Sequence, residues 1–164
     1  MENFPIFMIN SVFETILLVH IGFLLIGVKP KLRDTFVIAL IAGVLSYMIR
    51  SWSLPIGVTV LIQFPVLIVL TAYFNRLRIL YAVLGSLLGL VIIGLTEIAF
   101  NWIIVKMSGI SIEQAWAQPL WSFIFTVPEF LFLACVVIVL CRYNLALFKI
   151  EESNIELGEH YEQY

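Results

Sequence analysis

The sequence predicts an all-α protein, a transmembrane bundle of five helices followed by a short cytoplasmic C-terminal helix. Of its 164 residues, 62% are hydrophobic and 12% are charged, whereas soluble domains carry about 25% charged residues. Its mean hydropathy is +1.08. The apolar residues also fall into five long runs, which is the pattern of a multi-pass membrane protein. The sequence carries no basic patch of the kind that binds nucleic acid, so we expect the lipid bilayer to be the main partner.

The five apolar runs set the expected spans and the domain boundary. They cover Phe4–Val28, Thr35–Ile49, Ile56–Phe74, Ile79–Val105 and Leu120–Cys141. About 20 helical residues cross a ~30 Å hydrocarbon core. The second run is shorter, but the arginines that flank it can extend to both interfaces. We therefore expect a transmembrane bundle over residues 1–141 and a cytoplasmic amphipathic tail over residues 142–164.

The distribution of basic residues predicts the orientation of the bundle. Seven of the nine Lys and Arg residues fall in the first loop, the third loop and the tail, which share one side of a five-span bundle: Lys29, Lys31, Arg33, Arg76, Arg78, Arg142 and Lys149. Basic loops stay in the cytoplasm. The N-terminus is therefore expected outside, and the C-terminus inside, a bacterial cytoplasmic membrane.

The tryptophans fall at the expected outer interface, where an amphipathic indole ring prefers to sit. The four of them are Trp52, Trp102, Trp116 and Trp121. We interpret them either as interfacial anchors or as an aromatic rim that faces a ligand.

Polar side chains within the apolar runs are the candidate site residues. They are Glu14, Gln63, Glu97, Asn101 and Glu129. A charge exposed to lipid at the bilayer centre costs roughly 2.5–3.5 kcal/mol on insertion scales, so we expect each carboxylate to face the bundle interior. Two interpretations remain open. The residues are neutral acids and amides that hydrogen-bond the helices together, or they form a binding site for a proton, a cation or a polar ligand.

Prolines beside two of these residues favour the second interpretation. Pro65 lies two residues after Gln63, and Pro128 immediately precedes Glu129. A proline inside a helix frees a backbone carbonyl, which in a membrane needs a new donor or a water. By contrast, the sequence has no metal-ligand pair at fixed spacing and no catalytic motif. We therefore expect neither enzymatic activity nor a metal or cofactor.

The tail carries apolar residues at heptad spacing. Leu147, Ile150, Asn154 and Leu157 follow one another at intervals of three, four and three residues, with Asn154 as the polar position of a coiled-coil seam. We interpret the segment either as a coiled-coil stub that forms a homodimer or leads into a cytoplasmic partner, or as a frayed acidic tail.

Four features together resemble the N-terminal membrane region of GHKL-type sensor histidine kinases of Gram-positive bacteria. They are the multi-span input region, the basic first loop, the stretch GISIEQAWAQPLWSFIFTVPEFLFL and the exit LALFKIEESN. The resemblance implies a sensor in a two-component system, whose last span drives a coiled linker into a dimerising kinase module. The chain departs from the family because it contains no phosphoacceptor helix and no ATP-binding boxes.

We therefore expect a non-catalytic sensor or regulatory input module that signals through its C-terminal helix, with a kinase or another signalling protein as candidate cytoplasmic partner. The alternative is a membrane subunit of a small-solute or ion transporter. In that case Glu14, Glu97 and Glu129 would lie in the transport path.

Overall fold

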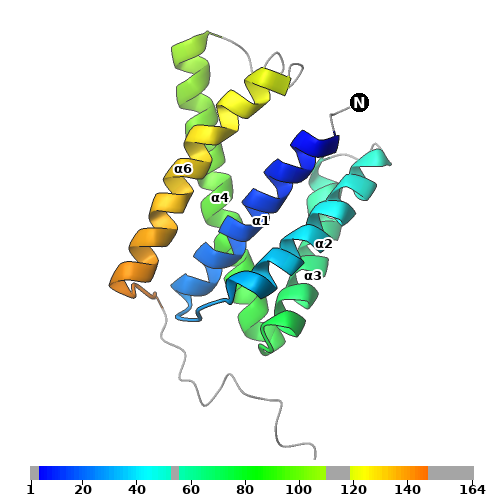
Figure 1. Ribbon diagram of the computed structural model, residues 1–164, viewed down its shortest axis with the longest axis vertical. Coiled ribbons are helices and arrows are strands. Elements are labelled where there is room, and N and C mark those ends of the chain that lie inside the picture. Colours follow the sequence, from blue (N-terminus) through cyan, green and yellow to red (C-terminus); the bar gives the residue numbers. More distant parts are fainter. Residues whose placement is uncertain (1–3, 53–55, 110–118, 148–164) are drawn as a thin grey trace, which may run out of the picture.

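The computed structural model describes residues 4–52, 56–109 and 119–147. Over these residues the chain is helical and contains no strand. The helices are α1 (Phe4–Leu25), α2 (Leu32–Ser51), α3 (Ile56–Phe74), α4 (Ile79–Ser108) and α6 (Pro119–Tyr143). Successive helices run in opposite directions (Figure 1). The all-α prediction is confirmed.

Four of these helices are long and apolar enough to cross a membrane. They are α1, α2, α4 and α6, whereas the apolar stretch described in α3, Val58–Phe74, is shorter. In an apolar helix of this length the backbone N–H and C=O groups pair with one another, and a segment that crosses lipid needs such internal pairing. The fold is therefore that expected of a multi-pass membrane protein.

The helix boundaries agree with the apolar runs to within three residues. The α3 boundaries coincide with those of the third run. Helix α1 ends at Leu25, before the end of its run, because Gly27 adopts a left-handed φ of 81°. The N–H of Gly27 donates to Leu24 O (3.0 Å) and that of Val28 donates to Phe23 O (2.9 Å), which is the Schellman pattern of a helix C-terminus.

The ends of α3 and α6 are closed in a similar way. Arg76 follows α3 with φ 51°, and Asn144 follows α6 with φ 47°. After α3 the N–H of Leu77 donates to Ala72 O at 3.0 Å. Asparagine is among the residues that adopt the left-handed conformation most readily. All three helices that end at the lower end of Figure 1 are thus followed by a left-handed residue.

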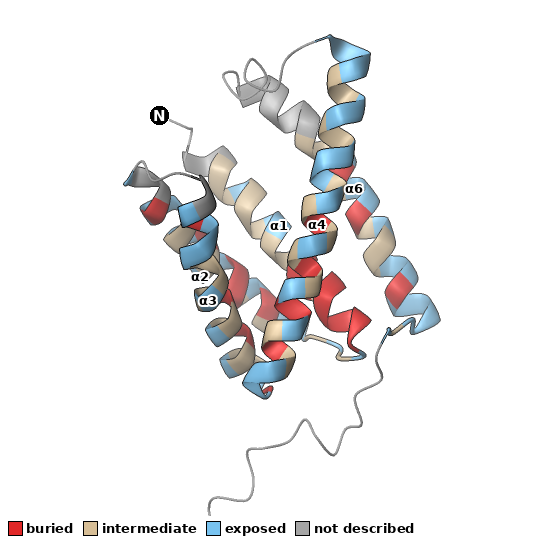
Figure 2. Cartoon of the chain, turned by 180° about the vertical axis from the view of Figure 1, so that it is seen from behind, coloured by how far each residue is buried: buried red, intermediate tan, exposed pale blue. Residues whose placement is uncertain are grey.

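Helix α1 lies at the centre of the bundle and packs against α2, α4 and α6. Its second half is the core, since every residue from Ile21 to Ile26 is buried. The matching part of α4 is its first half, where Ala82, Ser86 and Ile93 are buried. Figure 2 shows that buried segments gather in the lower half of the bundle, whereas the upper part of α4 is exposed or half-buried. In both views the upper end of α4 diverges from α1 and α2.

The tight lower half depends on glycines where α1 crosses α4. A Cβ atom at Gly22 of α1 would overlap the backbone carbonyl of Gly85, and a Cβ at Gly89 would overlap the carbonyl oxygen of Leu18. A Cβ at Gly85 would lie 3.0 Å from the ring of Phe23. Small residues allow such close approach of two helix backbones in lipid. The GxxxG spacing of Gly85 and Gly89 therefore serves packing within the chain.

We expect Gly22→Ala to lower the free energy of unfolding by at least about 1 kcal/mol. The new methyl group would meet backbone atoms, which cannot rotate away as a side chain can. The measurement is thermal or denaturant unfolding of the purified chain in detergent. Gly94→Ala is the matched control, since a Cβ at Gly94 would meet nothing within 4 Å and alanine favours helix by up to about 1 kcal/mol. Equal destabilisation of both variants would contradict the crossing.

Candidate polar site

Glu129 lies within electrostatic range of two other carboxylates, and the three groups belong to three different helices. Glu14 comes from α1, Glu97 from α4 and Glu129 from α6. The carboxylate of Glu129 interacts electrostatically with those of Glu97 and Glu14. The three helices also pack pairwise against one another. Residues from distant parts of the sequence thus form one acidic group, which we call the carboxylate cluster (Glu14, Glu97 and Glu129).

The burial of the three carboxylates differs. Glu129 is 6% exposed, as expected for an interior group. Glu14 and Glu97 are exposed in the isolated chain, so Glu129 is the one member of the three that the described residues enclose. The physical reason is the position of the other two along their helices. Glu14 precedes the buried part of α1, which begins at Leu17, and Glu97 follows Ile93, the last buried residue of α4.

Aromatic pairs hold α6 against both neighbouring helices beside the cluster. Phe13 of α1 and Phe130 of α6 stack with ring centroids 6.3 Å apart. Phe100 of α4 and Phe132 of α6 are tilted, with centroids 5.5 Å apart. Such pairs contribute about 0.5–1.5 kcal/mol beyond the area they bury. Two of these phenylalanines directly adjoin a glutamate in the sequence, a signal that the sequence analysis missed.

The amide residues of the predicted site divide between two places. Asn101 is half-buried and lies one helical turn beyond Glu97 on α4. Gln63 is half-buried on α3, and its Nε2 atom is buried with no hydrogen-bond partner. Helix α3 packs against α2 and α4 and lies on the side of the bundle away from α6 (Figure 1). Asn101 therefore shares a helix with a member of the carboxylate cluster, whereas Gln63 lies on a helix that contributes none.

The carboxylate cluster is not arranged as a metal centre. In the described ranges, no group of three His, Cys, Asp or Glu side chains is placed so that it could hold a metal ion. The ring of His20 is engaged locally, with its Nδ1 atom 2.9 Å from Ile16 O on the preceding turn. The cluster is thus an open set of acidic groups on three helices.

Two of the predicted rim tryptophans are described, and both are largely exposed. Trp52 follows α2 at 67% exposure and Trp102 lies on α4 at 61%. Both helices end at the upper end of Figure 1. The Nζ atom of Lys106 lies 4.2 Å from the centre of the Trp102 ring, a cation–π contact. Trp116 and the side chain of Trp121 lie outside the described residues.

The exit from α6 differs from a continuous helical linker. Helix α6 ends at Tyr143, and Asn144 turns the chain so that the N–H of Leu147 donates to Leu25 O at 2.7 Å. Leu147 is 64% exposed and lies outside any helix. A heptad helix that continues directly from the last span is therefore not observed. Ile150, Asn154 and Leu157 lie outside the described residues.

Helix length, apolar surface and intramembrane carboxylates are the features of a multi-pass membrane protein with a polar site between its helices. Comparison of the chain with protein-family models, curated proteins and solved structures finds no match. The site therefore has to be interpreted from its own chemistry.

We expect Glu97→Gln and Glu129→Gln to be non-additive in their effects on unfolding free energy, because the two carboxylates interact. A coupling of at least about 0.5 kcal/mol is typical of neighbouring charged residues. The measurement is a double-mutant cycle by unfolding in detergent. The control pair is Glu129→Gln with Asp34→Asn. Asp34 lies in the first turn of α2, so the effects of these two substitutions should be additive. Additivity in the first pair would contradict the cluster.

Proposed function

We propose that the chain is a five-span protein of the bacterial cytoplasmic membrane, with its N-terminus outside and its C-terminus in the cytoplasm. In this proposal it acts as a non-catalytic sensor or regulatory input module. The input is the binding of a proton or an organic cation at the carboxylate cluster. The output passes through α6 to the C-terminal segment, where a second copy or a cytoplasmic signalling protein, such as a kinase, receives it.

The observation that carries this proposal is the convergence of three carboxylates from α1, α4 and α6 around the buried Glu129. Ionisable groups within membrane helices are costly and mark sites of ligand or ion binding. Like charges held together repel one another, and a positively charged occupant removes that repulsion. An occupied site therefore favours an arrangement in which the three helices lie closer together. The occupant binds this closer arrangement more tightly than the open one, and a switch requires that difference in affinity.

The connection between α6 and α1 supports a route from the site to the tail. Helix α6 carries Glu129 and leads into the C-terminal segment, whose Leu147 is hydrogen-bonded to the last residue of α1. Helix α1 carries Glu14. A change in the relative position of the two helices at the cluster would therefore act on both ends of the Leu147–Leu25 hydrogen bond.

We expect the neutral variant Glu129→Gln to alter pairing of the tail between copies, because glutamine imitates an occupied, uncharged site. The chain would carry Leu147→Cys in a background of Cys135→Ser and Cys141→Ser, which replaces both native cysteines. The measurement is the yield of disulfide-linked dimer in membranes, with an expected change of at least about twofold. Asp34→Asn is the control and should leave the yield unchanged.

Two results would contradict signalling through a second copy. If no linked dimer forms in any of these chains, the tail does not pair between copies at Leu147. If dimer forms equally with Glu129 and with the glutamine variant, the cluster does not communicate with the tail.

The second candidate is a membrane subunit of a small-solute or ion transporter, which the same placement of carboxylates within possible spans favours. Purified chain in sealed vesicles with a pH-sensitive dye inside would distinguish the two functions. A transporter predicts proton or cation flux that Glu97→Gln lowers at least about tenfold, since that carboxylate would lie in the path. The sensor predicts no flux above that of protein-free vesicles for either chain.

A further inference from the structure

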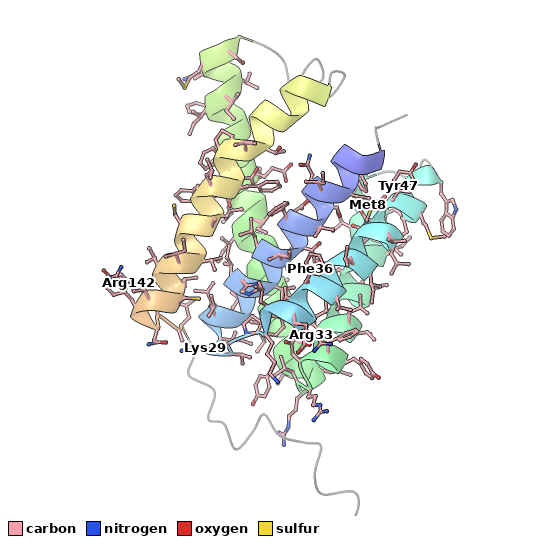
Figure 3. The ribbon with its side chains drawn as sticks, in the orientation of Figure 1. Met8, Lys29, Arg33, Phe36, Tyr47 and Arg142 are labelled. Carbon is pink, nitrogen blue, oxygen red and sulfur yellow. The ribbon has the colours of Figure 1, made fainter. Side chains whose placement is uncertain are left out.

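Six cations gather at the lower end of the bundle, although they come from three separate parts of the chain. They are Lys29, Lys31 and Arg33 around the α1–α2 connection, Arg76 and Arg78 between α3 and α4, and Arg142 in the last turn of α6. All six side chains are exposed. Figure 3 shows Lys29, Arg33 and Arg142 spread across the width of this end. We call these six residues the basic end.

Within the described ranges, no acidic side chain forms an ion pair with a residue of the basic end. The acidic residue nearest to it in sequence is Asp34, which lies in the first turn of α2 and there interacts favourably with the helix dipole. The basic end therefore keeps an excess of positive charge that is available to an anionic partner.

Exposed apolar and aromatic side chains directly adjoin these cations. Leu32 lies between two of them and is 67% exposed, Ile79 follows Arg78 at 68%, and Tyr143 follows Arg142 at 67%. Tyr73, near the end of α3, is 77% exposed. Each group of cations is thus next to exposed apolar helix surface. Tyrosines lie between the cations and this surface, and tyrosine is also enriched where a bilayer meets water.

We propose that the basic end binds the headgroups of anionic phospholipids, while the adjoining helix surfaces of α2, α4 and α6 contact their acyl chains. An amphiphile satisfies both halves of this surface at once. A free anion would neutralise the cations but leave the apolar strips uncovered, and so would an acidic peptide. The inference relies on the proposed membrane location and not on a sensing role. Its test leaves the carboxylate cluster unchanged, so either proposal can fail without the other.

The test titrates phosphatidylglycerol or phosphatidylcholine into the full-length chain in a neutral detergent and counts bound lipid by native mass spectrometry. We expect the unaltered chain to prefer phosphatidylglycerol. Attraction between anionic lipid and each Lys or Arg is worth about fivefold in binding. A variant with Lys29→Gln, Arg33→Gln and Arg142→Gln should therefore lose about a hundredfold in affinity, and added salt should weaken binding because the charges are exposed.

Lys106→Gln is the matched control, because it removes one cation from the opposite end of α4 and should change the affinity less than twofold. Unfolding temperatures should agree among all these chains, since the altered side chains are exposed. Equal binding of phosphatidylglycerol by the triple variant would overturn the proposal. So would equal binding of glycerol phosphate by the unaltered chain, which would show that the acyl chains contribute nothing.

The alternative occupant that the test considers is the acidic C-terminal segment of the same chain. A full-length chain with Glu151→Gln, Glu152→Gln and Glu156→Gln tests it in the same titration. If this chain binds phosphatidylglycerol and the unaltered chain does not, the segment occupies the basic end and the lipid proposal is wrong. Equal binding by both chains supports the proposal.

Discussion

The close crossing of α1 and α4 is the constraint on which the rest of the bundle depends. At Gly22 and Gly89 the two helix backbones approach so closely that a methyl group would overlap main-chain atoms, and at Gly85 it would press against the ring of Phe23. Dispersion forces between surfaces in contact hold helices together in lipid, because the hydrophobic effect between helices is absent there. With α1 fixed against α4, the remaining helices are arranged around α1, which contacts α2 and α6 as well.

The crossing also explains why polar residues lie where they do. It closes the lower half of the bundle, where the second half of α1 is buried, and the upper part of α4 diverges from α1 (Figures 1 and 2). The carboxylate cluster lies where the packed half gives way to the open half. Glu129 is still covered there, whereas Glu14 and Glu97 are exposed.

The lower end of the bundle has both capped helix ends and a concentration of positive charge. Left-handed residues follow α1, α3 and α6, and the backbone hydrogen bond from Leu147 to Leu25 ties the α6 exit to α1. The same end carries the exposed cations of the basic end. Any movement of α1 against α6 would therefore act on the Leu147–Leu25 hydrogen bond, at the same end of the bundle as these cations.

The sequence by itself determined the helical class and the approximate position of every described helix, because long apolar runs have one low-energy form in lipid. It also identified Glu14, Glu97 and Glu129 as exceptional, since an intramembrane carboxylate is costly wherever it lies. The tertiary structure decided that Glu129 interacts with the other two, that Gln63 lies on a helix without a member of the cluster, and that Glu129 alone of the three is buried. Helix rotation and crossing geometry fix these facts, and they arise from contacts between residues far apart in sequence. The break at Asn144 is also a tertiary outcome, because the heptad spacing favours a continuous helix there whereas the hydrogen bond to Leu25 requires the chain to turn.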